Sequence, residues 1–539
     1  MSAFSNLVDE FLEATWRQEP ALATNVGIHR YDHQLADVTP DALDAWGADL
    51  RDFHRRFESL DPSTLTIHEQ LDRRWALGVL DRAILDHDLR PWERAPRFYL
   101  QNVGIGLNDL LIGDHAPLEE RLRALLSRLQ AIPPSLATAR RNLRPTNIPP
   151  IWVEFGLLTA RSTRQFLSGA IPEAAALVPA LADEVTTASL AAAQAVHDFE
   201  GYIREIGGQA AGDFAIGRER FDFILKRYHM LDMDADQLYD FGCEWIDHYE
   251  REMAEVAHQI DPDCDWVETL ERIKDDHPTA EDLRQAYEDE TLLARQHCLD
   301  LDLITFPDGE SCSLEWMPTF MRASSPIAKP WTSPAFEPGL KSKWYITPVD
   351  SDAPPERQVQ HLRDSSWAWI RGIAQHEIYP GHHLHKVISK QVGTPLRLQF
   401  WSPIFGEGWG LYTEELWYET GPLAEPRFRL MQLRNGLWRA VRIVIDTGLH
   451  TRGMSAPEAV NWLADRARLE TRWAESEVRG YTTRPTYISS YRVGLSMLMD
   501  LREKVKAKQG SAFRLKDFHD RLMRYSTLPL AMVQEEMLR

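Results

Sequence analysis

Apolar side chains recur at helical spacing along most of this 539-residue sequence. The longest continuous runs are residues 66–89 and 117–142, and the alanine-rich stretch 173–205 has the same period. In each run apolar residues return every three or four positions, which places them on one face of a helix. The pattern therefore predicts a mainly α-helical fold. No segment recurs at a fixed length, so a solenoid is not predicted.

The segment 306–355 interrupts this pattern because it is rich in proline, serine and glycine. It contains Lys343–Val349, a short aromatic and β-branched run that includes Pro348 and is typical of an edge strand. We therefore divide the chain into a helical N-terminal lobe, residues 1–305, an irregular connector with one strand or hairpin, residues 306–355, and a helical C-terminal lobe, residues 356–539. All residues with recognisable chemistry lie in the last part.

The formal net charge of −21 argues against nucleic acid and against an anionic membrane surface as partners, because both bind clusters of basic side chains. The four cysteines are irregularly spaced, so neither a disulfide framework nor a cysteine zinc site is predicted. The N-terminal residues lack the basic and apolar parts of a signal peptide. No uncharged apolar run reaches the roughly 18 residues that a membrane span requires. These features predict a cytoplasmic protein without a membrane partner.

The segment Gln375–His383 holds a histidine–glutamate pair followed by two further histidines. In the zinc-hydrolase motif H-E-x-x-H, two histidines one helical turn apart bind one zinc ion and the glutamate activates water. Here Pro380 stands at the position of the second histidine, and His382 and His383 follow it. In a regular helix His376 and His382 would lie about 9 Å apart along the axis and on different faces. A regular helix therefore cannot place both on one zinc ion.

Pro380 and Gly381 can remove this conflict. Proline lacks an amide hydrogen and clashes with the carbonyl four residues earlier, so the helix must bend or bulge there. Glycine permits the backbone conformations that such a bulge requires. Two residues looped out would return His382 to the position of the second ligand. We predict His382 as that ligand and keep His383 as the alternative; the other of the two, with His385, would lie behind the ligands or face the substrate.

A third ligand is expected on a neighbouring helix. Glu407 lies 25 residues after His382, at a predicted helix start and between two glycines, where close packing is possible. The predicted centre therefore holds one Zn²⁺ ion on His376, His382 and Glu407. Glu377 would be the general base that takes a proton from the attacking water. Glu414 is a further candidate, expected to orient the histidines from behind.

Four segments of the chain resemble the bacterial domain-of-unknown-function family 885. They are H-E-I-Y-P-G-H-H at 376–383, F-G-E-G-W-G-L-Y-T-E-E-L at 405–416, R-I-V-I-D-T-G-L-H at 442–450 and Y-I-S-S-Y-R-V-G at 487–494. The resemblance covers nearly the whole chain. The family is regarded as a group of zinc metallopeptidases, largely helical and similar to the angiotensin-converting-enzyme and oligopeptidase folds. The resemblance implies two helical lobes with the metal at the floor of a cleft between them.

The resemblance also implies roles for residues that do not bind the metal. Tyr491 would donate a hydrogen bond to the oxyanion that forms during hydrolysis, with Arg492 and His450 as its neighbours. The strand Trp344–Thr347 could pair with an extended peptide substrate.

Together these features predict a zinc-dependent peptidase that acts on short peptides. The same centre would equally serve a metal-dependent amidohydrolase acting on a non-peptide amide. A third possibility is a non-catalytic binding protein that kept the fold, with the interrupted motif as a helix end bearing solvated imidazoles. The expected partner is a peptide or another small amide, and neither nucleic acid nor a membrane is expected. The sequence leaves the oligomeric state open.

Overall fold

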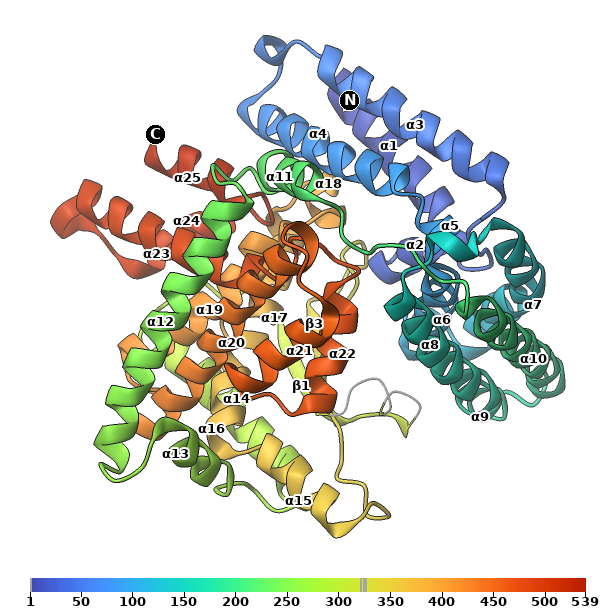
Figure 1. The fold of residues 1–539 in the computed structure, drawn as a ribbon. Helices are drawn as coiled ribbons and strands as arrows, with labels where there is room; N and C mark the ends of the chain where they lie inside the picture. The colour runs from blue at the N-terminus through green and yellow to red at the C-terminus, as the bar shows by residue number, and fades with distance from the viewer. Residues whose placement is uncertain (1, 320–321, 323–326) are drawn as a thin grey trace. The chain divides into compact units, whose positions relative to one another are not determined.

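The computed structural model describes residues 2–319, 322 and 327–539 (Figure 1). Helices account for 71% of the residues and strands for 3%, which confirms the prediction of a mainly α-helical fold. The packing of the backbone divides the chain into two units. As far as they are described, residues 1–214, 319–324 and 334–338 form the first unit, and residues 215–318, 325–333 and 339–539 form the second.

The first unit is a set of helices around one apolar core. Helix α10 packs against both α7 and α8, and Leu125, Leu129 and Phe199 are fully buried between these helices and their neighbours. The elements are α1 (Ala3–Gln18), α2 (Pro20–Val26), η1 (His29–Tyr31), α3 (Pro40–Ser59), η2 (Pro62–Thr64), α4 (Ile67–Asp88), α5 (Pro91–Arg94), α6 (Pro96–Ile112), α7 (Leu118–Asn142), η3 (Pro145–Asn147), α8 (Pro150–Ser168), α9 (Ala170–Ala175) and α10 (Ala182–Gly207).

The long helices of this unit follow the apolar period of the sequence. The predicted helices over 66–89 and 117–142 are observed as α4 and α7. The stretch 173–205 forms two helices instead of one, because α9 ends at Ala175 and α10 begins at Ala182. Pro179 lies in the break, where its ring and its missing amide hydrogen oppose a continuous helix.

The second unit combines helices with one small sheet. Its elements are α11 (Arg218–Arg227), α12 (Ala235–Ile260), α13 (Trp266–Lys274), α14 (Leu283–Asp300), β1 (Ser311–Trp316), β2 (Ala328–Thr332), β3 (Lys341–Ile346), α15 (Pro355–Asp364), α16 (Trp367–Glu377), α17 (His382–Val392), α18 (Pro395–Gln399), α19 (Pro403–Thr420), α20 (Pro426–Thr451), α21 (Ala456–Asp465), α22 (Thr471–Tyr481), α23 (Ser490–Gln509), η5 (Gly510–Ala512), α24 (Leu515–Met523) and α25 (Leu530–Leu538).

Helix α20 is the centre of the second unit. Every residue from Phe428 to His450 is buried, as expected of a helix covered on all sides. Helix α12 packs closely on it: a Cβ atom at Gly242 would lie 2.9 Å from Ile443, and one at Gly436 would lie 2.5 Å from Tyr249. Residues 215–305 are therefore part of the second unit. The sequence suggests a boundary at residue 305, whereas the observed boundary lies at residue 214. The packing of α12 on α20 joins residues that are far apart in the sequence, so no local pattern predicts it.

The three strands form one mixed sheet in the order β1-β3-β2. Strand β3 pairs with β1 in parallel and with β2 antiparallel, so that Trp344 lies opposite both Leu314 and Pro330. The prediction of an edge strand at Lys343–Val349 is therefore wrong, and β3 has no free edge for a peptide. Pro348 does not disturb the ladder, because the strand ends at Ile346.

The helix expected over residues 356–379 is interrupted. Helix α15 ends at Asp364, and Ser366 begins α16 by accepting a hydrogen bond from the amide of Trp369. Serine favours such N-cap positions because its hydroxyl replaces a missing helical acceptor. The metal motif therefore lies at the end of a separate helix, α16.

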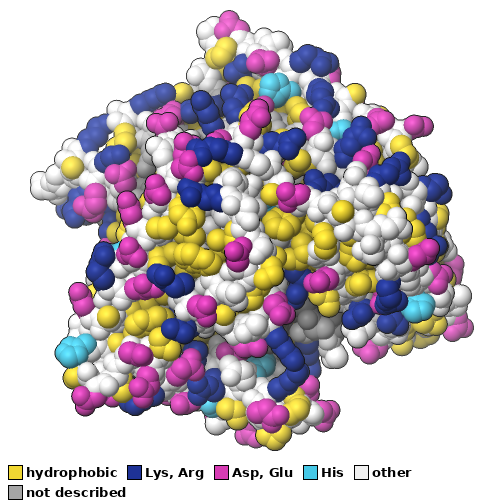
Figure 2. All heavy atoms as spheres, in the orientation of Figure 1, with side chains coloured by type: hydrophobic (Ala, Val, Ile, Leu, Met, Phe, Trp, Pro, Cys, Tyr) yellow, Lys and Arg dark blue, Asp and Glu magenta, His cyan; other side chains and the backbone are white. Residues whose placement is uncertain are grey.

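Acidic and basic side chains are mixed on the visible face of the molecule (Figure 2). On the face that Figure 2 shows, Lys and Arg side chains are interspersed with Asp and Glu, so the acidic excess does not gather in one region of this face. Among the helices of the described part of the chain, none has a stretch apolar and long enough to cross a bilayer.

Two glycines let α19 and α23 cross in direct backbone contact. A Cβ atom on Gly494 of α23 would lie 2.1 Å from the backbone oxygen of Ile404 and 2.6 Å from the Cα atom of Gly408 in α19. Both distances are far below a normal contact, so any side chain would force the helices apart. This crossing fixes α19, which carries Glu407, against α23, which carries Tyr491.

We expect Gly494→Ala to destabilise the protein by about 1–3 kcal/mol, because the added methyl group meets backbone atoms that cannot move aside. The midpoint of thermal unfolding should fall accordingly. Gly372→Ala in α16 is the matched control, because a Cβ atom there meets nothing within 4 Å and alanine favours a helix. Equal midpoints for the two variants would contradict the crossing.

Candidate metal centre

A tight turn joins α16 to α17 and takes the place of the predicted bulge. Helix α16 ends at Glu377 and α17 begins at His382, with a cis peptide bond before Pro380. A Cβ atom on Gly381 would lie 1.9 Å from the backbone oxygen of His376, so only glycine fits there. The turn brings the rings of His376 and His382 to a centroid distance of 4.9 Å. The prediction of one bulged helix is wrong in form, because the chain here breaks into two helices.

The predicted ligands and the predicted general base lie together in the second unit. One ligand atom from each of His376, Glu377 and His382 lies within 4.8 Å of the other two. Glu407 of α19 adds a carboxylate whose Oε2 is 3.4 Å from Nε2 of His382. Atoms bound at about 2.0–2.1 Å to one tetrahedral zinc ion lie roughly 3.3 Å apart. The separation of His382 and Glu407 therefore suits a shared ion.

Hydrogen bonds from outside the cluster orient two of these side chains. Nδ1 of His376 donates to Oε1 of Glu414 over 2.7 Å. Gly410 makes room for the ring, because a Cβ atom there would lie 2.7 Å from its Nε2. The hydroxyl of Tyr487 donates to Oε1 of Glu407 over 2.7 Å. Nε2 of His376 and Oε2 of Glu407 remain for a metal, the arrangement by which proteins hold metal ligands in place.

The cluster keeps Glu407 ionised although it is buried. Burial alone would raise the pKa of this carboxyl, but His382, His376 and the hydroxyl of Tyr487 outweigh burial and lower the pKa to about 2. Burial likewise opposes protonation of His376, yet Glu414 raises its pKa. Nδ1 of His382 is buried without a hydrogen-bond partner among the described residues. An ionised carboxylate beside imidazole nitrogens is a set of donors that transition-metal ions can bind.

His383, the alternative ligand, points to a different place. Its Nε2 donates to Oε2 of Glu310 over 2.9 Å, and its Nδ1 accepts from the hydroxyl of Ser342 over 2.6 Å. The same carboxylate oxygen accepts a hydrogen bond from Tyr379 of the turn. Both ring nitrogens of His383 are thus engaged, and the structure brings His382 to the cluster instead. His383 and Glu310 anchor the turn to the sheet.

His385 is also directed away from the cluster. Its Nε2 donates to the backbone oxygen of Ser526 over 3.0 Å, and its ring packs 4.8 Å from that of Phe405. Burial lowers its pKa to about 4. His385 is therefore a neutral, buried residue. Of the two places that the sequence left open for it, beside a substrate or behind the ligands, its contacts do not support the first.

The residues expected beside Tyr491 have partners of their own. Nε2 of His450 donates to the backbone oxygen of Tyr481 over 3.2 Å. The guanidinium carbon of Arg492 lies 3.2 Å from the centroid of the Trp245 ring in α12. Consecutive helical residues point about 100° apart, so Arg492 faces α12 when Tyr491 faces another way. Neither residue joins the described metal-ligating group.

Tyr491 lies in the first turn of α23 within reach of the charges of the cluster. Burial and the negative charges of Glu407 and Glu377 raise its pKa, which keeps the phenol protonated. The guanidinium carbons of Arg442 and Arg439 lie 5.0 and 6.0 Å from its ring centroid. A protonated phenol near two cations is a good hydrogen-bond donor to a developing negative charge.

Tyr487 and Glu310 are two residues of this region that the sequence did not indicate. Tyr487 precedes α23 in a turn held by Asp446, which accepts hydrogen bonds from the amide of Thr486 at 3.1 Å and the hydroxyl of Ser489 at 2.6 Å. This turn aims the Tyr487 hydroxyl at Glu407, 80 residues earlier in the chain. The tyrosine itself stands in the segment 487–494, but only the fold shows which partner it contacts.

Two solved structures share this fold. One is described as "a putative lipoprotein of unknown function from Shewanella oneidensis"; it is 22% identical, has a TM-score of 0.83, and all of both chains is covered. The other, "the putative lipoprotein from Colwellia psychrerythraea", is 16% identical with a TM-score of 0.82, and covers 100% of this chain and 99% of its own. At these identities the likeness shows the fold alone. No curated protein matches the sequence.

These structures contradict one prediction. The sequence predicts a cytoplasmic protein, whereas both similar structures are described as a "putative lipoprotein". The prediction rested on the absence of a signal sequence and of an apolar span. The expectation of a cytoplasmic location is therefore wrong.

The sequence also matches a family model. The model is described as "Bacterial protein of unknown function (DUF885)" and matches residues 20–537. The match includes the turn, the cluster and both tyrosines, and its description names no activity. The chain therefore belongs to this bacterial family of unknown function, DUF885.

Proposed function

We propose that this protein is a zinc-dependent peptidase that hydrolyses short peptides. The observation that carries the proposal is the cluster of His376, His382 and Glu407 with Glu377 beside it. The four side chains come from three different helices, and two of the three ligands have a hydrogen-bond partner behind them. Such support is typical of metal centres in hydrolases.

The donor set fits zinc. Two imidazoles and one carboxylate would hold the ion through His376, His382 and Glu407, as in zinc hydrolases that leave a position open for water. When bound, zinc supplies a Lewis acid and makes water more acidic near neutral pH. The carboxylate of Glu407 is already ionised, so it would bind the ion without first losing a proton.

The remaining residues divide the chemistry between them. Glu377 would accept the proton of the attacking water and then pass it to the leaving amine. Tyr491 would donate a hydrogen bond to the oxygen of the scissile carbonyl as it gains negative charge. Tyr487 cannot share that role while its hydroxyl is bound to Glu407. A non-peptide amide would meet the same groups, so substrate assays must separate the two classes.

Zinc content and activity should depend on His382 and not on His383. His382→Ala removes one nitrogen ligand, so one equivalent of zinc and all hydrolysis should be lost when the purified protein is analysed for metal. His383→Asn is the comparison variant, because it removes the hydrogen bonds to Ser342 and Glu310 and no predicted ligand: it should lower the unfolding midpoint but keep the zinc. A chelator should abolish activity, and added Zn²⁺ should restore it. Retention of zinc by His382→Ala with its loss from His383→Asn would reverse the assignment.

Glu377→Gln should lower kcat by about 10²–10⁴-fold, the usual contribution of a general base. The glutamine is isosteric, so zinc content should not change. The assay is hydrolysis of a mixed library of dipeptides and oligopeptides by both proteins. If wild type and variant are equally active, or both inert on peptides while wild type hydrolyses other amides, the peptidase proposal fails.

Two tyrosine variants separate catalysis from metal binding. Tyr491→Phe should lower kcat by about 10²–10³-fold, because it removes an oxyanion donor, and should leave zinc affinity unchanged. Tyr487→Phe should lower the affinity for zinc by about 10–100-fold, because it removes the hydrogen bond that orients the predicted ligand Glu407. Zinc affinity from competition with a chelating dye and kcat at saturating zinc distinguish them. If both variants changed zinc affinity and kcat in the same way, the assignment of Tyr491 to catalysis and of Tyr487 to zinc binding would be wrong.

A further inference from the structure

The central helix α20 carries buried arginines of two kinds. Its buried arginines, each between 5% and 7% exposed, are Arg429, Arg434, Arg439 and Arg442. Arg429 forms ion pairs with Glu252 at 2.6 Å and Glu415 at 3.0 Å, and Arg442 forms one with Glu477 at 3.0 Å. Arg434 and Arg439 form no ion pair with any described residue. Two buried cations of this helix therefore have no carboxylate as partner.

The hydrogen bonds of these two arginines are also few. Arg439 donates to the backbone oxygen of Asn435 over 3.2 Å, and Arg434 donates to Oδ1 of Asn435 over 3.2 Å and to the backbone oxygen of Arg468 over 3.5 Å. A guanidinium group carries five N–H donors, so most of them stay unused. Nε of both arginines and Nε1 of Trp438 are buried donors without a hydrogen-bond partner among the described residues.

The unused donors gather around one ring beside the candidate centre. The guanidinium carbons of Arg434 and Arg439 lie 5.9 and 4.7 Å from the centroid of the Trp438 ring. That of Arg439 also lies 6.0 Å from the ring centroid of Tyr491, the proposed oxyanion donor. Trp473 of α22 packs edge-on against Trp438 at 5.2 Å and is only partly buried. The two cations thus lie next to the place where the scissile carbonyl would bind.

The charges of the two arginines are not balanced by the chain around them. Burial, together with the charge of Arg439, lowers the pKa of Arg434 to about 10, and burial lowers the pKa of Arg439. Glu414 and Glu407 attract Arg439 from a distance, but both already accept hydrogen bonds within the candidate centre. A buried cation without a counter-ion is strongly unfavourable, so the pair invites an anion.

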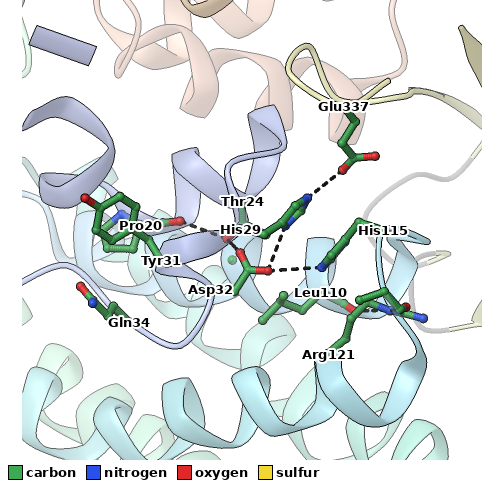
Figure 3. A network of polar contacts seen from close by, with 12 residues as sticks. Pro20, Thr24, His29, Tyr31, Asp32, Gln34, Leu110, His115, Arg121 and Glu337 are labelled. Atoms are coloured by element: carbon green, nitrogen blue, oxygen red, sulfur yellow. Dashed lines mark hydrogen bonds and ion pairs between the residues drawn. The ribbon is translucent and has the colours of Figure 1, made fainter. Parts of the chain in front are cut away.

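A cation of the first unit shows the usual solution. Nδ1 and Nε2 of His29 donate to Asp32 over 2.9 Å and to Glu337 over 3.0 Å (Figure 3). The two carboxylates outweigh burial and raise the pKa of His29 to about 9. At Arg434 and Arg439, water would accept the unused hydrogen bonds but would leave both charges unbalanced. An anion supplies the acceptor atoms and the charge together.

A carboxylate is the anion that a peptide substrate offers, and its two oxygens suit the planar fork of a guanidinium group. The carboxyl carbon at the C-terminus of a dipeptide lies roughly 3–4 Å from the scissile carbonyl carbon. This short span matches the closeness of Arg439 to Tyr491. An acidic side chain on the same residue would reach a similar place.

We propose that Arg434 and Arg439 bind a carboxylate of the substrate. The proposed peptidase, on which this assignment rests, would then cleave the bond next to a residue that carries a free carboxylate. The carboxylate would belong either to the C-terminus of the peptide or to an aspartate or glutamate side chain. Binding it would balance the buried charge and hold the scissile carbonyl at Tyr491.

The first test compares hydrolysis of charged and neutral peptides by the full chain with zinc. The peptides are acetylated dialanine as free acid and as amide, and acetylated alanyl-glutamate amide with its glutamine counterpart. Wild type should show a kcat/KM about 10²-fold or more higher for the charged member of one pair. The first pair identifies a C-terminal carboxylate and the second an acidic side chain. Arg439→Gln and Arg434→Gln should lower kcat/KM for the charged peptide and spare the neutral one. Equal kcat/KM for both members of each pair in wild type, or a preference that survives in both variants, would overturn the proposal.

Thermal unfolding distinguishes a binding role from a structural one. Arg439→Gln removes an unbalanced buried charge, so its unfolding midpoint should equal or exceed that of wild type. Arg429→Gln is the matched control on the same helix, because it leaves Glu252 and Glu415 without their cation. It should lower the midpoint and keep the preference for the charged peptide. A midpoint of Arg439→Gln as low as that of Arg429→Gln would assign Arg439 to the stability of the fold instead.

Binding separates this proposal from the hydrolase itself. Isothermal titration of Glu377→Gln with the same peptides should show about 10²-fold tighter binding of the charged member, and Glu377→Gln/Arg439→Gln should lose that difference. Selective binding by Glu377→Gln without any hydrolysis by wild type would refute the peptidase and keep the carboxylate site. Hydrolysis by wild type without selective binding would refute the carboxylate site and keep the peptidase.

Discussion

The turn between α16 and α17 is the constraint on which the candidate centre depends. A regular helix would separate His376 from His382, whereas the turn brings their rings to 4.9 Å. Its shape is held from three directions: Gly381 lies against the backbone of α16, Trp409 donates to the carbonyl oxygen of Pro380 over 2.8 Å, and Tyr379 donates to Glu310. His376 and Glu377 come to lie beside His382 only because these contacts fix a backbone that the local sequence alone would leave free.

Two close contacts between helix backbones position the other residues of the candidate centre. Gly410 lets α19 approach the ring of His376, and the glycine pair at the crossing of α19 and α23 brings Glu407 next to the tyrosines of the 487–494 segment. Helix α20, which is buried from Phe428 to His450, packs against α16, α19 and α23, the helices that make these contacts. Where helix backbones touch, even a small increase in side-chain volume would move the helices. The positions of Glu407 and of the tyrosines therefore depend on these glycines.

The sequence predicts what local pattern determines and fails where distant partners decide. Helices α4 and α7 follow from apolar period, and the proline and glycine of the motif show that a straight helix cannot continue. The central place of β3 could not be predicted, because its neighbours are set by long connections. Tyr487 and Glu310 were missed for the same reason: their partners lie 80 and 73 residues away. Residue types and spacing identify candidate ligands, but not which of two adjacent histidines faces them.

The Glu310 contact has a consequence for the order of assembly. This carboxylate precedes β1 and accepts hydrogen bonds from Tyr379 in the turn and from His383 at the start of α17. The turn therefore reaches its final shape only after Glu310 and His383, 73 residues apart in the sequence, have come together. Closing such a loop is slow compared with helix formation. During folding the helices would form before the candidate ligands are in place, and the proposed metal centre would be among the last parts of the native structure to assemble.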